Sequence, residues 1–342
     1  MENIISNSIV AAATVTAVPD INMLAERFGQ LSGQLERIEP YTGPCPEFKP
    51  VTQSDMALIM TYLEQAPGRT TDYSYGGILM WVDYFKYEYC IIEDTLFIKG
   101  AVENDLSRES FAMPIGRLPL SQSLGILKAW CERHGTPLVM SAIPSEGLES
   151  LRPFLPKSVE LLTDWGDYLY DAVDLAQLKG KRYSKKRNHV NQFMNGVADW
   201  HLEPLTAANA GEAMAFMDIF DLEGDDTPMA IEERQLTRNM VQAIADGDCV
   251  MEGALLYADG KVCAFTIGDR RGDTLFIHIE KATRHVPGSY EAINTLFARS
   301  MTEAYPEIKY INREDDSGDE GLRFAKESYH PVEVLKKYNV IF

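Results

Sequence analysis

Several features that define large classes of protein are missing from this chain of 342 residues. No stretch approaches the roughly 18 consecutive apolar residues that a membrane-spanning helix requires. The five cysteines (Cys45, Cys90, Cys131, Cys249 and Cys263) are scattered and never form a Cys-x-x-Cys pair. This usage is typical of reduced thiols and argues against a disulfide framework and a zinc site. We therefore expect a cytoplasmic protein with no metal and no integral membrane contact.

An excess of positive charge is missing as well. The chain has 51 acidic residues against 32 Lys and Arg, which gives a formal net charge of −19. Such a field repels nucleic acids, anionic lipids and nucleotide phosphates, so any anionic partner needs a local basic patch. No basic residue precedes the mildly apolar run 9–18. We therefore interpret residues 1–44 as an N-terminal extension rather than an export signal.

The sequence also contains no Walker loop and no GxGxxG, HExxH or GxSxG motif. Nothing in it therefore indicates a kinase, a dehydrogenase, a metalloprotease or a serine hydrolase.

The hydrophobic fraction of 45% and the aromatic fraction of 10% are those of a globular chain that is long enough for two domains. The same order of elements is predicted twice along the sequence. It begins with helices, continues with a pair of strands, and ends with a helix, a strand, a second helix and a second strand. We predict an α/β (α+β) fold with an N-terminal extension (1–44), two domains (45–175 and 201–342) and a linker helix (176–200). Each domain is expected to be a mixed central sheet flanked by helices. The predicted helices cover 56–63, 78–87, 121–135, 146–152, 209–222, 231–245, 288–304 and 321–329. The predicted strands cover 89–98, 110–115, 137–143, 168–173, 250–257, 262–269, 274–280 and 308–311, with an extended tail at 332–342.

The linker carries the local basic patch, with six Lys or Arg between Lys179 and Arg187. One side of its predicted helix is apolar and is expected to pack between the domains; it comprises Tyr183, Val190, Phe193 and Met194. Another side is cationic and comprises Arg182, Lys185, Lys186 and His189. In one interpretation, the patch binds the phosphates of RNA or of a nucleotide-bearing acyl donor. In the other, it is a solvated helix whose charges pair with acidic residues of the same protein.

The predicted strand 274–280 alternates, with Phe276, His278 and Glu280 on one face. A histidine and a carboxylate two residues apart can act as base and orienter for an attacking amine. A buried histidine with a purely structural role is the alternative interpretation.

A carboxylate-rich turn at 312–321 leads into the last predicted helix. Leu322, Ala325, Lys326 and Tyr329 share one face of that helix, which turns a lysine inward. An inward lysine either extends to solvent or meets a buried anion, such as an aspartate or a substrate carboxyl.

Two segments, Lys179–Phe193 and Arg313–Pro331, resemble a bacterial family of unknown function that is grouped with the C-terminal domain of phosphatidylglycerol lysyltransferase. The resemblance covers the chain from about Cys45 onward. It implies two tandem GNAT-like domains, related to the Fem-type peptidoglycan aminoacyltransferases. The lysyltransferases move an aminoacyl group from charged transfer RNA to a lipid hydroxyl. Their C-terminal pattern is matched by Gly321, Leu322, Lys326, Tyr329, Pro331 and Tyr338.

The chain departs from that family pattern in lacking a tryptophan after Pro331 and in having about one extra residue before Tyr338. A membrane segment is also missing. We therefore expect a small-molecule or peptide acceptor rather than a lipid.

The coenzyme A motif of GNAT acetyltransferases would have a small residue where this chain has Tyr290. A bulky side chain there would keep a pyrophosphate away from the helix N-terminus. An aminoacyl-tRNA-like donor is therefore favoured, with no cofactor needed, and coenzyme A is the alternative.

Together these features predict an aminoacyl- or acyltransferase. Glu280, Asp316, Lys326, His278 and Tyr329 are the expected catalytic residues; a carboxylate would remove a proton, and Lys326 or backbone amides would stabilise the oxyanion. The phosphates of the donor would be bound by Arg182, Lys185, Lys186, Arg187 and His189. Two rival hypotheses are an acyl-CoA-dependent N-acyltransferase and a non-catalytic module of the same fold that binds a ligand or RNA.

Overall fold

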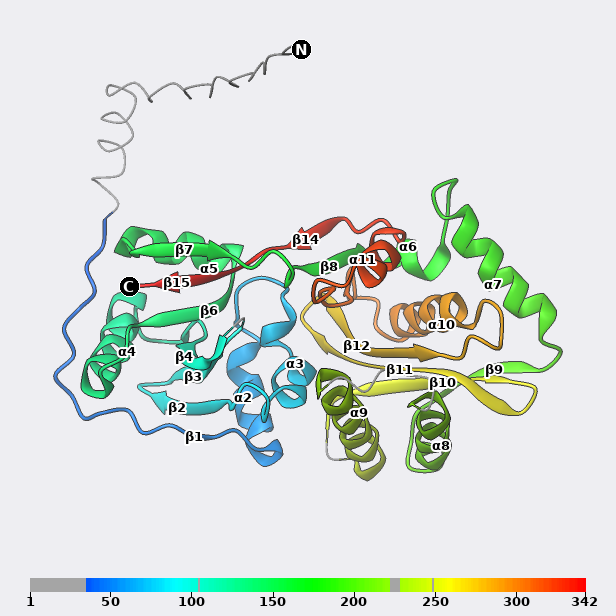
Figure 1. The fold of residues 1–342 in the computed structure, drawn as a ribbon, viewed down its shortest axis with the longest axis horizontal. Helices are drawn as coiled ribbons and strands as arrows, with labels where there is room; N and C mark the ends of the chain where they lie inside the picture. Colours follow the sequence, from blue (N-terminus) through cyan, green and yellow to red (C-terminus); the bar gives the residue numbers. More distant parts are fainter. Residues whose placement is uncertain (1–34, 104, 222–227, 248) are drawn as a thin grey trace, which may run out of the picture.

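The computed structural model describes residues 35–103, 105–221, 228–247 and 249–342. Two mixed β-sheets stand side by side along the long axis of the molecule, and helices pack against each of them (Figure 1). Within the described ranges, no helix combines the length and the hydropathy needed to cross a bilayer.

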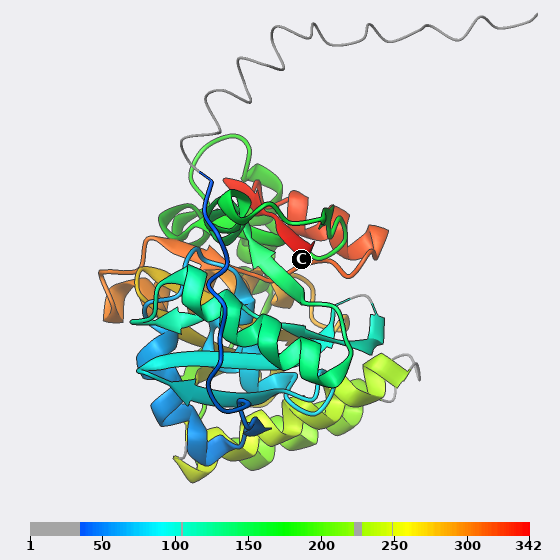
Figure 2. The same cartoon turned by 90° about the vertical axis from the view of Figure 1, so that its left-hand side faces the viewer.

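The first sheet has the strand order β1-β2-β3-β4-β6-β15-β7, with β5 paired to β3. Its strands are β1 (Lys49–Pro50), β2 (Glu88–Ile92), β3 (Thr95–Val102), β4 (Asp105–Phe111), β5 (Ile115–Gly116), β6 (Val139–Pro144), β7 (Ser158–Leu161) and β15 (Lys337–Ile341). Its helices are η1 (Gln53–Asp55), α2 (Met56–Leu63), η2 (Thr71–Tyr73), α3 (Tyr75–Met80), α4 (Leu120–His134), α5 (Ser145–Leu151) and η3 (Arg152–Phe154). The segment 35–48 runs along α4 (Figure 2), where the amide of Glu39 donates to the carbonyl of Ser121 at 3.1 Å.

The second sheet has the strand order β14-β8-β13-β12-β11-β10-β9. Its strands are β8 (Asp167–Asp171), β9 (Trp200–Pro204), β10 (Glu252–Ala258), β11 (Lys261–Arg271), β12 (Thr274–Ala282), β13 (Tyr310–Asn312) and β14 (Glu333–Leu335). Its helices are α6 (Ala172–Gln177), α7 (Ser184–Gly196), α8 (Ala210–Asp221), α9 (Pro228–Asp246), α10 (Ser289–Ala304) and α11 (Glu320–Glu327). Helices α8 and α9 cover one face of this sheet, and α10 covers the other (Figure 1).

Sheet membership does not follow the predicted division at residue 175. Strand β8 lies before that boundary, yet it pairs with β13 and β14 in the second sheet. The last strand, β15, crosses back to pair with β6 and β7 in the first sheet. The two halves therefore exchange strands and are held together by backbone hydrogen bonds at the upper edge of Figure 1.

Several predicted elements differ from the structure; for example, the strand predicted at 110–115 is β4, which begins earlier and covers Asp105–Phe111. The strand predicted at 89–98 is a hairpin, because Glu93 and Asp94 take positive φ angles of 47° and 58° and reverse the chain. This left-handed pair forms the turn without a glycine, so the sequence contains no turn signal. The helix predicted at 78–87 is the short α3, which ends at Met80. Beyond it, the aromatic rings of Trp81, Tyr84 and Phe85 pack against one another in a turn.

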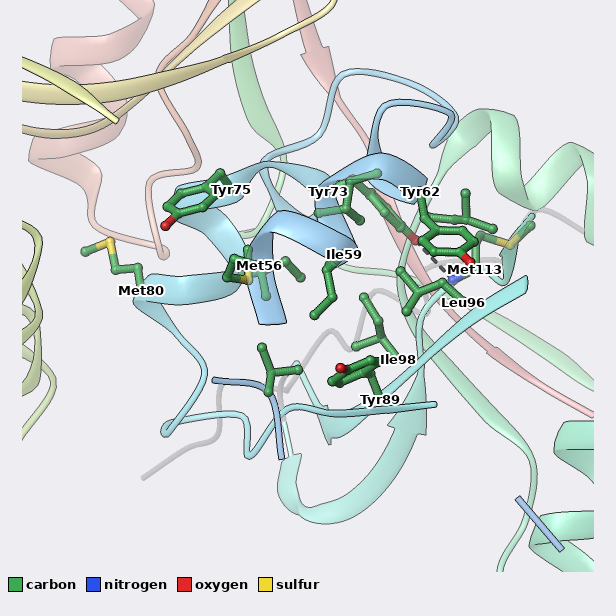
Figure 3. Close-up of a cluster of buried hydrophobic side chains, with 14 of the residues drawn as sticks. Met56, Ile59, Tyr62, Tyr73, Tyr75, Met80, Tyr89, Leu96, Ile98 and Met113 are labelled. Atoms are coloured by element: carbon green, nitrogen blue, oxygen red, sulfur yellow. Dashed lines mark hydrogen bonds between the residues drawn. The ribbon is translucent and has the colours of Figure 1, made fainter. Parts of the chain in front are cut away.

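The core of the first half forms between α2, α3 and the strands β2 and β3 (Figure 3). Met56, Ile59 and Leu63 are fully buried because they recur at helical spacing on one face of α2. The Tyr73 hydroxyl, which Figure 3 shows with its hydrogen bond, accepts from the amide of Met113 at 3.2 Å. This core is continuous with the residues under α8 and α9, so the two halves share one apolar interior.

The predicted apolar side of the linker helix is confirmed, because Tyr183, Val190 and Phe193 are buried. Helix α7 is shorter than predicted, however, and Phe193 packs against α10 of the second half rather than between the halves.

Candidate functional site

A cavity lies where the second sheet opens. Strands β12 and β13 run parallel and pair only from Thr274 to Phe276. Beyond that point β12 continues to Ala282, while the chain after Asn312 turns away into the loop before α11. A cavity of about 280 Å³ occupies the gap, between β12, this loop, α11 and the segment 71–87 of the first half. Both halves of the molecule therefore contribute to one site.

Aromatic side chains form much of the cavity wall. Trp81, Tyr84 and Tyr87 come from the turn after α3, Trp165 precedes β8, and Tyr290 lies in the first turn of α10. The rings of Trp81 and Tyr84 meet edge to face with centroids 5.6 Å apart. Because aromatic faces attract cations, such a wall suits an ammonium group as well as an apolar one.

Carboxylates also line the cavity. Burial, together with the charge of Asp72, raises the pKa of Glu103 to about 8. Burial likewise raises the pKa of Asp315. Asp72 itself pairs with Lys337 at 3.0 Å, and Lys337 also pairs with Asp167 at 2.9 Å. An incoming ammonium ion would relieve the electrostatic repulsion among these acids.

Lys326 is the buried residue of α11 and lines the cavity, so the predicted inward lysine is found. Its ammonium donates to the carbonyl of Arg313 at 2.6 Å and to the carbonyl of Asp315. Burial lowers the pKa of Lys326, while the charges of Asp315 and Glu314 oppose that shift. Because an ammonium group has three hydrogens, one remains for a ligand after these two hydrogen bonds.

His278 and Glu280 lie on the same face of β12, as predicted, and both line the cavity. The His278 ring is enclosed between the carboxylates of Asp269 and Glu314. Glu280 accepts from Arg313 at 2.7 Å and from the side-chain amide of Asn294 at 2.9 Å. Each group is therefore engaged with protein partners.

Asp316 and Tyr329 are not among the residues that line the cavity. Asp316 accepts from Tyr168 and Arg323, and the hydrogen bond from Arg323 lowers its pKa to about 2. The Tyr329 ring is buried behind Arg313, whose guanidinium carbon lies 4.8 Å from the ring centroid. The geometry favours structural roles for Asp316 and Tyr329, and their catalytic roles stay predictions.

The basic stripe of the linker is largely paired with the protein itself. Arg182 contacts Asp174, whereas Lys186 and His189 contact Glu291 of α10 at 3.6 and 2.9 Å. Lys186 also lies 3.9 Å from the centroid of the Tyr329 ring. Arg187 donates to the carbonyls of Leu178 and Gly180. By contrast, Lys185 is exposed, as are Lys179 and Lys181.

The N-terminus of α10 is covered by α7. The N-cap, Gly288, has a φ of 80°, and a Cβ atom there would lie 2.1 Å from the carbonyl oxygen of His189. Glu291 places a negative charge in the first turn of α10, where it accepts from α7. An incoming phosphate would meet this backbone and this carboxylate, instead of the free amides that usually bind phosphates.

Several site residues were not predicted from the sequence. Arg313, Glu314 and Asp315 belong to the carboxylate-rich turn that the sequence did reveal, but their proximity to β12 depends on the fold. Lys337, Glu103 and the aromatic residues after α3 have no local signal, because they come from distant parts of the chain. Among the described residues, no group of three or more His, Cys, Asp or Glu is arranged to hold a metal ion.

A protein-family model described as the C-terminal part of phosphatidylglycerol lysyltransferase matches residues 64–341. A crystal structure of a conserved protein of unknown function from Bacteroides thetaiotaomicron is 30% identical, with a TM-score of 0.77 over 86% of this chain and 99% of that one. An uncharacterised protein of Mycoplasmoides gallisepticum is 26% identical over 175 residues, which is 51% of this chain. That match spans about half, 55%, of the relative's own length.

Two further structures share the fold at low sequence identity. L-PGS from Bacillus licheniformis has a TM-score of 0.57 and 16% identity, over 83% of this chain and 91% of that one. FemX has a TM-score of 0.59 and 9% identity, over 87% of this chain and 98% of that one. The predicted α/β (α+β) fold class, with two mixed sheets that are each flanked by helices, is confirmed, and the chain shares this fold with FemX.

Proposed function

Because the chain belongs to the family of the C-terminal part of phosphatidylglycerol lysyltransferase, we propose that it is an acyltransferase. In this proposal it moves an activated aminoacyl group from a transfer-RNA-like donor onto an amine or hydroxyl acceptor. The observation that carries the proposal is the buried Lys326 ammonium beside the cavity, with one hydrogen left for a ligand. Preorganised donors of this kind stabilise the oxyanion that forms when an ester carbonyl is attacked.

The donor is proposed to place its aminoacyl ester in the cavity. The acid-rich and aromatic wall suits the ammonium of an aminoacyl group, since Glu103 and Asp315 both have raised pKa values that a bound cation would lower. Aromatic rings such as Trp81 would add a cation–π contribution of about 0.5–2 kcal/mol.

Coenzyme A is the less favoured donor, because α7 and Glu291 occupy the N-terminus of α10. A pyrophosphate there would lack the free backbone amides that normally bind it. An RNA donor would instead meet the exposed Lys179, Lys181 and Lys185 on and beside α7.

The experiment uses the purified full-length chain with transfer RNA charged with radiolabelled amino acids. Candidate acceptors are offered separately: glycerol, phosphatidylglycerol vesicles and short amine-bearing peptides. We expect acceptor-dependent loss of label from the RNA, with the label recovered on one acceptor. Transfer from acetyl-CoA instead would favour an N-acyltransferase, and binding without any transfer would favour a non-catalytic module.

Lys326→Met supplies the matched variant, with the exposed Lys336→Met as control. Loss of one oxyanion donor is expected to lower kcat by roughly 10²–10³-fold, by analogy with other preorganised sites. Equal rates for both variants would remove Lys326 from the reaction.

A further inference from the structure

Three charged side chains form a line that ends at the cavity. Asp269 of β11 is buried and accepts from the backbone amides of Tyr75 and Gly76 at 3.2 and 3.0 Å. Its carboxylate also contacts Nε2 of His278. Nδ1 of His278 lies 2.8 Å from the carboxylate of Glu314, which lines the cavity. Each member of the line is thus fixed by the one before it.

The two flanking carboxylates favour the protonated, positively charged form of the His278 ring. Burial alone would lower its pKa, but the charge of Asp269 and the hydrogen bonds to Asp269 and Glu314 outweigh burial and raise the pKa to about 10. A doubly protonated imidazole donates from both nitrogens and has no lone pair for another proton. His278 is therefore poorly placed to act as the base itself.

Glu314 is held in an unusual backbone conformation at the edge of the cavity. Its φ is 57°, a left-handed value that is uncommon for a residue other than glycine. Its amide donates to the side chain of Asn312 at 2.7 Å, and its carbonyl accepts from the amide of Tyr168 at 3.0 Å. Local strain of this kind persists only where the surroundings impose it, and it is concentrated at functional sites.

We propose that Glu314 is the general base of the transfer reaction, and that Asp269 and His278 are positioning residues that hold its carboxylate toward the cavity. This inference rests on the proposed function. Glu280, the carboxylate that the sequence places beside His278, is instead paired with Arg313.

The proton of the acceptor passes through Glu314 during the transfer. The acceptor N–H or O–H gives its proton to the free oxygen of Glu314 while its lone pair forms a bond to the ester carbon. The carbonyl electrons move onto oxygen, which Lys326 stabilises. When the intermediate collapses, the bond from carbon to the ribose oxygen of the donor breaks, and Glu314 returns the proton to that leaving oxygen. Glu314 ends as the carboxylate from which it began.

The charges around Glu314 suit this role. Burial raises its pKa above the usual glutamate value, opposed by the hydrogen bond and charge of His278 and by Lys326, while the neighbouring Asp315 adds to the rise. Among the other charged groups of the cavity, Asp72 pairs with Lys337, Glu280 with Arg313 and Glu233 with Lys281, whereas burial raises the pKa values of Glu103 and Asp315. A raised pKa makes a carboxylate a stronger base.

The first test is kinetic. It uses charged transfer RNA together with the acceptor that becomes labelled in the transfer experiment. Glu314→Gln is expected to lower kcat by roughly 10²–10⁴-fold, and Glu314→Asp by less, while the exposed Glu327→Gln on α11 leaves it unchanged. For Asp269→Asn we expect the acid limb of the kcat/KM profile to move to higher pH, because a less cationic His278 stabilises the Glu314 carboxylate less. Full activity of Glu314→Gln, or an unmoved profile for Asp269→Asn, would overturn the inference.

The second test needs no turnover. NMR of ¹⁵N-labelled histidine should show the His278 ring fully protonated at pH 8 in the wild type and titrating at lower pH in Asp269→Asn. A neutral His278 ring at pH 8 would overturn the positioning role, whatever reaction the protein catalyses. Absence of transfer by the wild type with a protonated His278 would instead overturn the proposed function, and with it Glu314 as base, while leaving the Asp269–His278–Glu314 geometry in place.

Discussion

Arg313 and Glu280 form a buried ion pair in the cavity wall, with 2.7 Å between Nη2 and Oε1 and only 6% of each side chain exposed. Arg313 comes from the loop after β13 and Glu280 from β12, so the pair bridges the two strands beyond the point where they diverge. Burial lowers the pKa of the Arg313 guanidinium, but the charge of Glu280 and the other nearby groups together have the larger effect and raise this pKa. The opening of the sheet is thus held by charge rather than by backbone hydrogen bonds.

Arg313→Met should destabilise the protein by about 3–5 kcal/mol, because it leaves the Glu280 carboxylate buried without its partner. The double variant Arg313→Met with Glu280→Leu should recover a large part of that loss. Urea unfolding measures both changes. The exposed pair Arg152 and Glu149 provides the control, where Arg152→Met should cost less than about 1 kcal/mol. Equal costs at both pairs would contradict the importance of burial.

Lys337 connects the exchanged strand β15 with the site. Its ammonium pairs with Asp72 of the first half and with Asp167 of β8. Lys337→Met should lower the free energy of unfolding by about 3–5 kcal/mol, because two buried carboxylates lose their cation. The neighbouring exposed Lys336→Met is the control. If both substitutions have the same small effect, the exchanged strand is not stabilised by this cluster.

The exposed lysines beside α7 should govern the salt dependence of donor binding. Within the described chain, Lys179, Lys181 and Lys185 form no ion pair, unlike Arg182 and Lys186. Replacing these three lysines by Ala should weaken binding of charged transfer RNA and flatten the plot of log K against log salt by about 0.7–0.9 for each phosphate that the protein no longer neutralises. Fluorescence titration at several salt concentrations measures this, with the exposed Lys261→Ala as control. An unchanged slope, also with Arg182, Lys185 and Lys186 replaced together, would exclude α7 from donor binding.

His278 should make stability depend on pH in the alkaline range. Its pKa is about 10 in the folded protein and 6.5 in the reference state. A raised pKa contributes stability that is complete below pH 6.5 and is lost as the pH rises to about 10. The difference in unfolding free energy between wild type and His278→Gln should therefore shrink over that window. A constant difference would indicate a neutral His278.

Local signals in the sequence were sufficient for many elements of the fold. Helix α4 ends where predicted, because Gly135 adopts the left-handed C-cap conformation with a φ of 69°. The hairpin between β10 and β11 follows from Asp259 and Gly260. The strand exchange of β8 and β15 could not be predicted in this way, because it depends on pairing between residues that are distant in sequence.

Local signals in the sequence likewise account for only part of the site. The inward position of Lys326 and the shared face of His278 and Glu280 follow from helical and strand periodicity, whereas Leu322, predicted on the same face, is exposed. The partners of His278 could not be predicted in this way. The position of Glu314 depends on the course of the loop, and the position of Asp269 depends on the register between β11 and β12. The basic stripe was visible in the sequence, but its pairing with Glu291 required the packing of α7 on α10.

Locating a stable donor analogue in the structure tests the central claim most directly. The full-length protein would be crystallised with adenosine that carries an aminoacyl group through a 3′-amide, which cannot be transferred. We predict density for the aminoacyl group in the cavity between β12 and α11, with its carbonyl oxygen within hydrogen-bonding distance of Lys326 Nζ. An aminoacyl group bound elsewhere, or an empty cavity in a protein that binds the analogue, would contradict the account.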